Sequence, residues 1–186
     1  MKKLIREIVL SRTYQLSTDS GAQAKVDLEN ELHWRQNRRR LQAESIRDAI
    51  LSVSGQLDKT MGGPTIKTGT GIEYGYKFDD TRRSLYTPVF RNTPLEILAV
   101  FDFADPNLVV GERTTSSVPT QALFLMNNPF VRQQAEAAAT RLLQEDLTDD
   151  SARIAHAYQR TLGRHPTSTE RDVILKFVQT EKDPAT

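Results

Sequence analysis

The sequence predicts a mainly α-helical domain that carries one β-hairpin insertion and ends in a C-terminal helical hairpin. Three observations support this class. Apolar residues recur at helical spacing over most of the chain, one short segment alternates strictly between apolar and polar residues, and capping motifs precede several apolar stripes. The 186 residues, 38% of them hydrophobic, suffice for a single domain over residues 1–186 with a core of its own. An amphipathic pattern starts at the first residues, so we expect a fragment of a larger protein.

Two helices are predicted in the N-terminal third. The first covers about residues 2–14, where Leu4, Ile5, Ile8 and Val9 are separated by charged residues. A polar loop follows. The second predicted helix enters through "ENELHWRQNRRR" and continues through "LQAESIRDAILSVSG". Gly55 is expected to end it, because glycine readily takes the left-handed conformation found at helix ends.

The β-hairpin is predicted at about residues 72–90. Ile72, Tyr74, Tyr76 and Phe78 alternate with polar residues and glycine, a spacing typical of a strand with one aromatic face. Residues 79–81 would form the turn, and "RRSLYTPVF" the returning strand. The preceding "GGPTIKTGTG" lacks a lysine after its second glycine and leads into a strand, so we interpret it as a loop and not as a phosphate-binding motif.

Helices are predicted again after the hairpin. Thr93 and Glu96 form a capping box around Pro94, and this helix should end before Asp105-Pro106. Ser116 or Ser117 would cap the next helix, and Asn128 the one after it.

The C-terminal pair spans about residues 150–180. Gly163 should end its first helix, and a capping box from Thr167 to Glu170 should begin its second. The apolar stripes of the two helices are expected to pack Tyr158 and Leu162 against Ile174 and Phe177.

Composition restricts the chemistry. There is no cysteine, which excludes thiolate zinc sites, iron–sulfur clusters and the usual haem attachment motif. The three histidines are far apart in sequence, so we expect no metal and no cofactor. The net charge of +1 argues against a dedicated nucleic-acid binder, and the basic stretch "HWRQNRRR" fits a salt-bridged helix better than a phosphate-binding patch. No apolar run approaches the roughly 20 residues that span a membrane, so no membrane insertion is expected.

A candidate polar cluster gathers charged residues from three segments. Carboxylates four residues apart on one helix could do acid–base work in a cleft, but a charge network that fixes the hairpin to the helices is favoured. The members are Glu44, Arg47, Asp48, Arg82, Arg83, Asp102, Asp105 and Arg113.

The segment "FDFADPNLVVGERTTSSVPTQALF" could be either a reactive loop or a structural connector between two helices. It contains no histidine that could activate a nucleophile, so the connector is favoured. Its aspartates are expected to accept hydrogen bonds from backbone amides and from Arg82, Arg83 or Arg113.

Several blocks of the sequence together resemble the planctomycete-type domain of unknown function numbered 1553. In order, they are "LENELHWRQNRRRLQAESIRDAILSVSGQLDKTMGGP", "RRSLYTPVFRN", "EILAVFDFADPN" and "TTSSVPTQALFLMNNPFV". Glu31 and Glu112 depart from the expected basic residues. The resemblance implies the C-terminal end of a large secreted or periplasmic protein, which often also carries a cytochrome c module. It therefore implies an extracytoplasmic location, and it carries over no catalytic residue.

Three hypotheses for the function follow. The first is a non-catalytic binding or scaffolding domain, whose partners are the other domains of its parent protein and whose ligand is not identified. The second is an enzyme domain that acts on a polymer such as a polysaccharide, with acid–base groups drawn from Glu44, Asp48, Asp102 and Asp105. The third is a docking surface for the cytochrome c module. Unpaired carboxylates in a cleft would favour the enzyme, and fully paired charges the scaffold.

Overall fold

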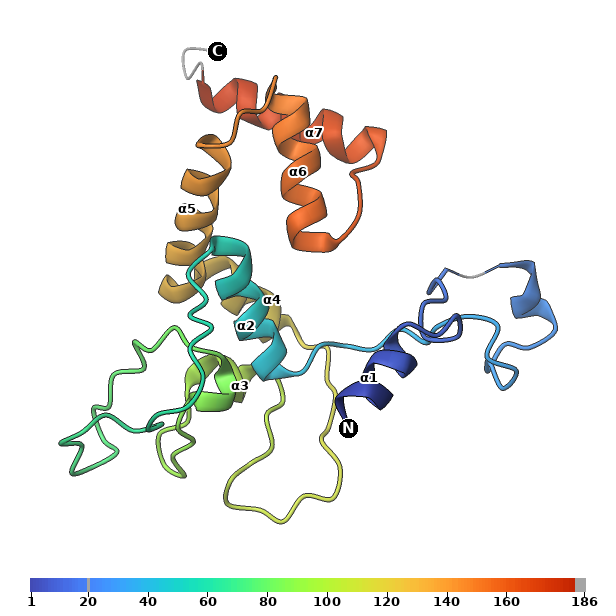
Figure 1. The fold of residues 1–186 in the computed structure, drawn as a ribbon. Coiled ribbons are helices and arrows are strands. Elements are labelled where there is room, and N and C mark those ends of the chain that lie inside the picture. The colour runs from blue at the N-terminus through green and yellow to red at the C-terminus, as the bar shows by residue number, and fades with distance from the viewer. Residues whose placement is uncertain (20, 183–186) are drawn as a thin grey trace. The chain divides into compact units, whose positions relative to one another are not determined.

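The computed structural model describes residues 1–19 and 21–182, and Figure 1 shows the chain as a ribbon. Over these residues it is mainly helical, with seven α-helices and two short 3₁₀ helices. The prediction of a mainly α class is confirmed. The chain divides into two compact units, Met1–Leu41 and Gln42–Thr186. The candidate residues and the pockets described below lie in the second unit.

The first unit contains α1 (Lys2–Val9) and the 3₁₀ helix η1 (Ala22–Lys25). The helix α1 is shorter than the predicted span of residues 2–14, because Ser11 accepts and donates hydrogen bonds that turn the chain at once. Its hydroxyl donates to the Ile8 carbonyl at 2.7 Å and accepts from the Tyr14 N–H at 3.3 Å. Leu4, Ile5 and Ile8 on this helix are exposed.

Residues 29–40 are not helical, so the prediction of a helix entering at "ENELHWRQNRRR" is wrong. Asn30 and His33 both have left-handed backbone conformations, with φ of 60° and 53°. The amide side chain of buried Asn30 donates to the Arg35 carbonyl at 2.8 Å and accepts from the Arg35 N–H at 3.2 Å. Side chains of this type compete with the helical hydrogen-bond ladder, and here the side chain replaces it.

The core of the second unit lies among α2 (Ala43–Ser54), α3 (Glu96–Val100), α4 (Pro119–Asn127) and α5 (Pro129–Leu143). Phe101 and Phe124 meet edge to face, with ring centroids 5.9 Å apart. The buried apolar cluster consists of Ala43, Ile97, Leu98, Phe101 and Phe124, and Leu51 is fully buried on α2. Burial of this kind stabilises by about 25 cal/mol per Å² of apolar surface. These contacts hold α2, α3 and α4 together beneath the candidate residues.

The predicted β-hairpin at about residues 72–90 is wrong, since none of the described residues forms a strand. An isolated parallel β-bridge joins Asp58 to Arg82. The carbonyls of Asp80 and Arg82 accept hydrogen bonds from Arg47 of α2, which takes acceptors that a strand ladder would need. The alternating aromatic residues instead collect in a cluster of edge-to-face rings made by Tyr76, Phe78 and Phe90. A 3₁₀ helix, η2 (Ser84–Tyr86), follows.

Local capping signals divide into those that are confirmed and those that are wrong. Gly55 ends α2 with φ 80°, and the side chain of Asn128 caps α5 by accepting from the Phe130 N–H. Thr93 does not cap α3, whose N-cap is Leu95 without a side-chain bond. Neither serine before α4 caps it, because Val118 holds that position and Pro119 begins the helix.

The C-terminal pair consists of α6 (Asp150–Leu162) and α7 (Ser168–Lys182), which pack against each other. Gly163 ends α6 with φ 68°. The predicted capping box is confirmed, because the Thr167 N–H donates to Glu170 at 2.8 Å and the Glu170 N–H donates to Thr167 Oγ1 at 3.3 Å. The expected burial is wrong for Leu162 and Phe177, which are 58% and 64% exposed.

Candidate functional site

The structure distributes six of the eight predicted site residues among three separate hydrogen-bonded groups, and Arg83 and Asp105 lie outside them. The first group joins α2 to the segment around η2. Arg47 is 3% exposed, and its guanidinium donates to the Arg82 carbonyl at 2.9 Å and to the Asp80 carbonyl. Burial lowers the pKa of Arg47, while the negative charges of Asp48 and Asp80 act in the opposite direction. A buried guanidinium with these acceptors joins two segments of the chain firmly.

Asp48 completes the link between α2 and η2. Its Oδ1 accepts from both the backbone N–H and the hydroxyl of Ser84, each at 2.7 Å. Ser84 is itself buried, and its hydroxyl oxygen lies 3.3 Å from Nη1 of Arg47. Asp48 therefore holds η2 against α2 through one of its two carboxylate oxygens.

Arg82 extends this group toward the glycine-containing loop before it. It forms an ion pair with Asp80 at 2.7 Å and donates to the carbonyls of Gly62 and Pro64 at 2.9 and 2.8 Å. The hydrogen bond from Arg82 lowers the pKa of Asp80. Arg82 also lies over the ring of Tyr86, at 5.0 Å from its centroid. One guanidinium thus joins the loop of Gly62 and Pro64 to Asp80 and to Tyr86 of η2.

Glu44 and Arg113 form the second group. Nη1 of Arg113 lies 2.8 Å from Oε2 of Glu44, and its guanidinium stacks over Phe103 at 4.9 Å. Burial raises the pKa of Glu44, but the hydrogen bond and charge of Arg113 outweigh it and leave the pKa below its ordinary value. This ion pair ties the loop after α3 to the first turn of α2.

Asp102 organises the third group, at the end of α3. Its carboxylate accepts from the Ser116 N–H at 2.7 Å and from the Ser116 hydroxyl at 2.8 Å. Buried Gln121 of α4 donates to it at 3.4 Å and to the Val100 carbonyl at 3.1 Å. Asp105 lies apart from these residues and accepts from the Asn107 N–H at 2.8 Å. Both aspartates accept backbone amides, as the connector hypothesis expects.

The arginines do not pair with those aspartates as expected. Arg113 forms its ion pair with Glu44, and Arg82 forms its own with Asp80. Arg83 is partly buried, and its Nε finds no hydrogen-bond partner.

Four residues that complete these groups were not in the predicted cluster. Asp80 was placed only in a turn, Ser84 only in a strand and Ser116 only at a helix start, and Gln121 was not singled out. The sequence carried one signal for these groups, because Gln121 is a polar residue near the start of a predicted helix.

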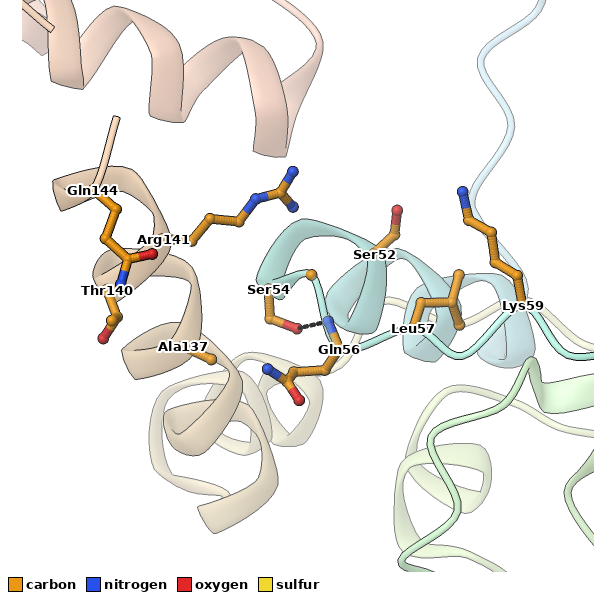
Figure 2. A pocket seen from close by; sticks show the side chains of 10 residues that line it. Ser52, Ser54, Gln56, Leu57, Lys59, Ala137, Thr140, Arg141 and Gln144 are labelled. Carbon is orange, nitrogen blue, oxygen red and sulfur yellow. Dashed lines mark hydrogen bonds between the residues drawn. The ribbon is translucent and has the colours of Figure 1, made fainter. Parts of the chain in front are cut away.

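A polar pocket lies where the end of α2 meets the last turns of α5 (Figure 2), with a volume of about 650 Å³. Arg141 reaches from α5 toward Gly55, and a Cβ placed on that glycine would lie 3.1 Å from its Nη1. Lys59 lies on the segment after α2. The lining residues include no carboxylate, and they are Ser52, Ser54, Gly55, Gln56, Leu57, Lys59, Ala137, Thr140, Arg141 and Gln144.

An apolar groove runs along α2, α5 and α6, with a volume of about 460 Å³. Small side chains of α5 form its floor. The lining residues are Ala49, Ile50, Val53, Val131, Gln134, Ala135, Ala138, Ala139, Leu142, Ala157, Arg160 and Thr161. Val131, Ala135, Ala138 and Leu142 recur at helical spacing along one face of α5, and the groove exposes part of that face.

Two further properties concern only the described part of the chain. Within residues 1–19 and 21–182, no group of three or more histidine, aspartate or glutamate residues is arranged to hold a metal ion. Over the same ranges, no helix is both long and apolar enough to cross a membrane.

The chain belongs to the PSD1 family, whose description is protein of unknown function (DUF1553), because the family model matches residues 1–178. The match confirms the resemblance drawn from the sequence blocks. Neither a curated protein nor a solved structure matches the chain.

Proposed function

We propose that this PSD1 domain is a non-catalytic binding and scaffolding domain, and that its partners are the other domains of a larger extracytoplasmic protein. One observation carries the proposal: the candidate carboxylates are used internally. Glu44 binds Arg113, Asp48 binds Ser84, and Asp102 binds Ser116. A general acid or base must reach the proton it transfers on a substrate. These carboxylates instead connect segments of their own fold, which favours a scaffold over a polymer-cleaving enzyme.

Exposed apolar surface supports a role in packing against other domains. The chain exposes 14184 Å², whereas a compact monomer of 21.0 kDa is expected to expose about 9,000 Å². Counting the two units as separate compact bodies raises the expected area only to about 10,500 Å². Large exposed apolar patches on a protein mark surfaces that bind other proteins. The chain therefore exposes more surface than a compact domain of its size, and its exposed residues include large apolar side chains such as Met126, Leu143 and Phe177.

The apolar groove along α2, α5 and α6 is the surface we assign to a neighbouring domain. Ala135 and Ala139 are exposed, yet they face a groove whose other members are mostly apolar. Such a groove of small side chains suits an apolar helix face or an extended apolar segment, which recognise binding grooves by burying regularly spaced side chains.

The test is binding between this chain and the remainder of its parent protein, expressed separately. Ala135→Arg and Ala139→Arg place a charge in the groove, and Glu136→Arg places the same charge on α5 outside it. We expect the two groove variants to weaken binding about tenfold or more in calorimetry, while Glu136→Arg leaves it within a factor of about two. Absence of binding by the unmodified chain, or equal losses in all three variants, would overturn the proposal.

The extracytoplasmic location is part of the same proposal and is supported by the family resemblance. A fusion of the parent protein to alkaline phosphatase, which is active only outside the cytoplasm, tests it. We expect an active fusion. An inactive phosphatase fusion beside a fluorescent cytoplasmic one would place the domain inside the cell.

A further inference from the structure

We propose that the polar pocket between the end of α2 and α5 binds a small, sugar-sized acid through its carboxylate, sulfate or phosphate group. This inference is independent of the proposed domain packing, because the pocket and the apolar groove are lined by different residues. Figure 2 shows the polar side chains that approach the pocket from both helices.

Charge is the first reason. Two cations, Lys59 and Arg141, line the pocket, and no carboxylate does. Neither cation forms a hydrogen bond or an ion pair within the described residues. The charge of Arg141 does help to lower the pKa of Glu145, after the larger effect of the hydrogen bond from Arg160. That carboxylate is already bound by Arg160 and His156, at 2.6 and 2.7 Å, and so leaves Arg141 available to a ligand.

The C-terminal end of α2 is the alternative partner for Arg141, because the carbonyls there carry a partial negative charge. A helix end of this kind amounts to about half an elementary charge. Two full positive charges line the pocket, so a net positive potential remains. Gly55 at this helix end also lets the guanidinium approach closely, since any Cβ there would crowd Nη1 at 3.1 Å.

Size and hydrogen-bonding capacity define the rest of the ligand. A volume of about 650 Å³ lies in the range of small-molecule sites, roughly 300–1,000 Å³. It is much larger than a bare phosphate or sulfate ion. Ser52, Thr140 and Gln144 add hydroxyl and amide groups to the lining, and these suit the hydroxyl groups of a sugar acid or a sugar phosphate. Apolar ligands would leave these groups unsatisfied.

Buried Ser54 fixes the wall of the pocket. Its hydroxyl lies 2.7 Å from Oε1 of Gln134 and 2.9 Å from the Leu51 carbonyl, and it accepts from the Gln56 N–H at 3.4 Å. The contact with Gln134 joins α2 to α5 at the pocket, and the other two fix the end of α2. The two walls therefore hold a defined separation before a ligand arrives, which lowers the cost of binding.

Calorimetric titration of the whole chain with glucuronate, glucose 6-phosphate, glucose 6-sulfate and neutral glucose tests the proposal. We expect at least one acid to bind with a Kd below about 1 mM and glucose to bind at least tenfold more weakly. Affinity should fall as ionic strength rises, because salt screens the two exposed cations. The preferred acid identifies the anionic group.

The variants Lys59→Gln and Arg141→Gln should each weaken that binding about tenfold, and Arg132→Gln, on the same helix outside the pocket, should not. Lys59 lies on an exposed segment, so its variant tests the pocket even if Arg141→Gln loosens the end of α2. The proposal fails if no acid binds with a Kd below about 1 mM, if glucose binds as well as the acids, or if Lys59→Gln and Arg141→Gln weaken binding no more than Arg132→Gln does.

Discussion

Ser84 binds one carboxylate oxygen of Asp48 twice, through its backbone N–H and through its hydroxyl, each at 2.7 Å. The two residues are 36 positions apart in sequence, and they join η2 to α2. Arg47, the residue before Asp48, buries its guanidinium beside the same serine and donates to the carbonyls of Asp80 and Arg82. The long irregular segment between α2 and α3 is therefore held by polar contacts with one helix.

We predict that Arg47→Met lowers the free energy of unfolding by about 3 kcal/mol or more. The substitution keeps an unbranched apolar side chain but leaves the partly buried carbonyl oxygens of Asp80 and Arg82 without this donor, and an unsatisfied buried acceptor costs about 1–3 kcal/mol. Urea denaturation measures the change. Arg132→Met on exposed α5 is the control, and it should stay within about 0.5 kcal/mol. A loss below about 1 kcal/mol in Arg47→Met would show that water satisfies those carbonyls.

Asp102→Ala and Asp105→Ala should differ in their effect on the melting temperature. Asp102 adopts φ 59°, a conformation that costs alanine more than aspartate, and its carboxylate binds Ser116. We expect Asp102→Ala to lose about 2 kcal/mol and so about 4–8 °C in a chain of this size. Asp105 is exposed and accepts only a local amide from Asn107, so its loss should cost about 2 °C or less.

A control and a competing outcome separate the connector from a reactive loop. Asp102→Asn keeps an acceptor and tolerates the left-handed backbone, so it should recover most of the stability. Thermal unfolding followed by circular dichroism measures all three variants. Unchanged stability in Asp102→Ala, together with a lost ligand or activity, would make this loop a site instead of a connector.

Phe177→Ala should change stability by no more than about 0.5 kcal/mol, because its side chain is 64% exposed. Ile154→Ala provides the matched comparison within the same helical pair. Ile154 is buried on α6, so its truncation should cost about 2–4 kcal/mol. Urea denaturation of both variants measures the difference. If Phe177→Ala costs as much as Ile154→Ala, another part of the protein covers Phe177 in solution.

Features decided within a few residues could be predicted from the sequence. Asn128, Gly163 and the Thr167–Glu170 capping box occupy the predicted helix ends, because each acts on backbone groups within a turn of itself. Asn30 shows the limit of this reasoning. Its side chain replaces the helical ladder at Arg35, although the local composition favoured a helix.

The features that the sequence did not predict depend on contacts between distant segments of the chain. Alternation at residues 72–78 indicates a strand only if a partner strand accepts its hydrogen bonds, and Arg47 occupies the carbonyls of Asp80 and Arg82 instead. The pairing of Glu44 with Arg113 spans 69 positions, and no local pattern specifies it. The polar cluster was therefore predicted by residue type, whereas its division into separate groups required the structure. The pocket of Lys59 and Arg141 escaped notice because its two cations come from different segments.

The carboxylate of Glu170 provides a pH-dependent prediction for the start of α7. Its pKa is lowered from 4.5 to about 2, chiefly by hydrogen bonds from Arg164 at 2.7 and 2.8 Å and then by the backbone N–H of Thr167. A lowered pKa in the folded state means that the unfolded chain takes up the proton first as the solution is acidified. The stabilising contribution is thus complete above about pH 4.5 and is lost as the pH falls toward 2.

Nuclear magnetic resonance titration of the Glu170 side-chain carboxyl carbon measures this directly. We expect a midpoint near pH 2 in the unmodified chain and a midpoint shifted toward 4.5 in Arg164→Gln, because the largest cause of the shift is removed. Thr167→Val removes the hydroxyl bond to the carboxylate at 3.0 Å and the acceptor of the Glu170 N–H, but it keeps the bond from the Thr167 backbone N–H and should shift the midpoint less. A midpoint near 4.5 in the unmodified chain would show that the contacts between Arg164 and Glu170 do not persist in solution, and that α7 begins without its predicted cap.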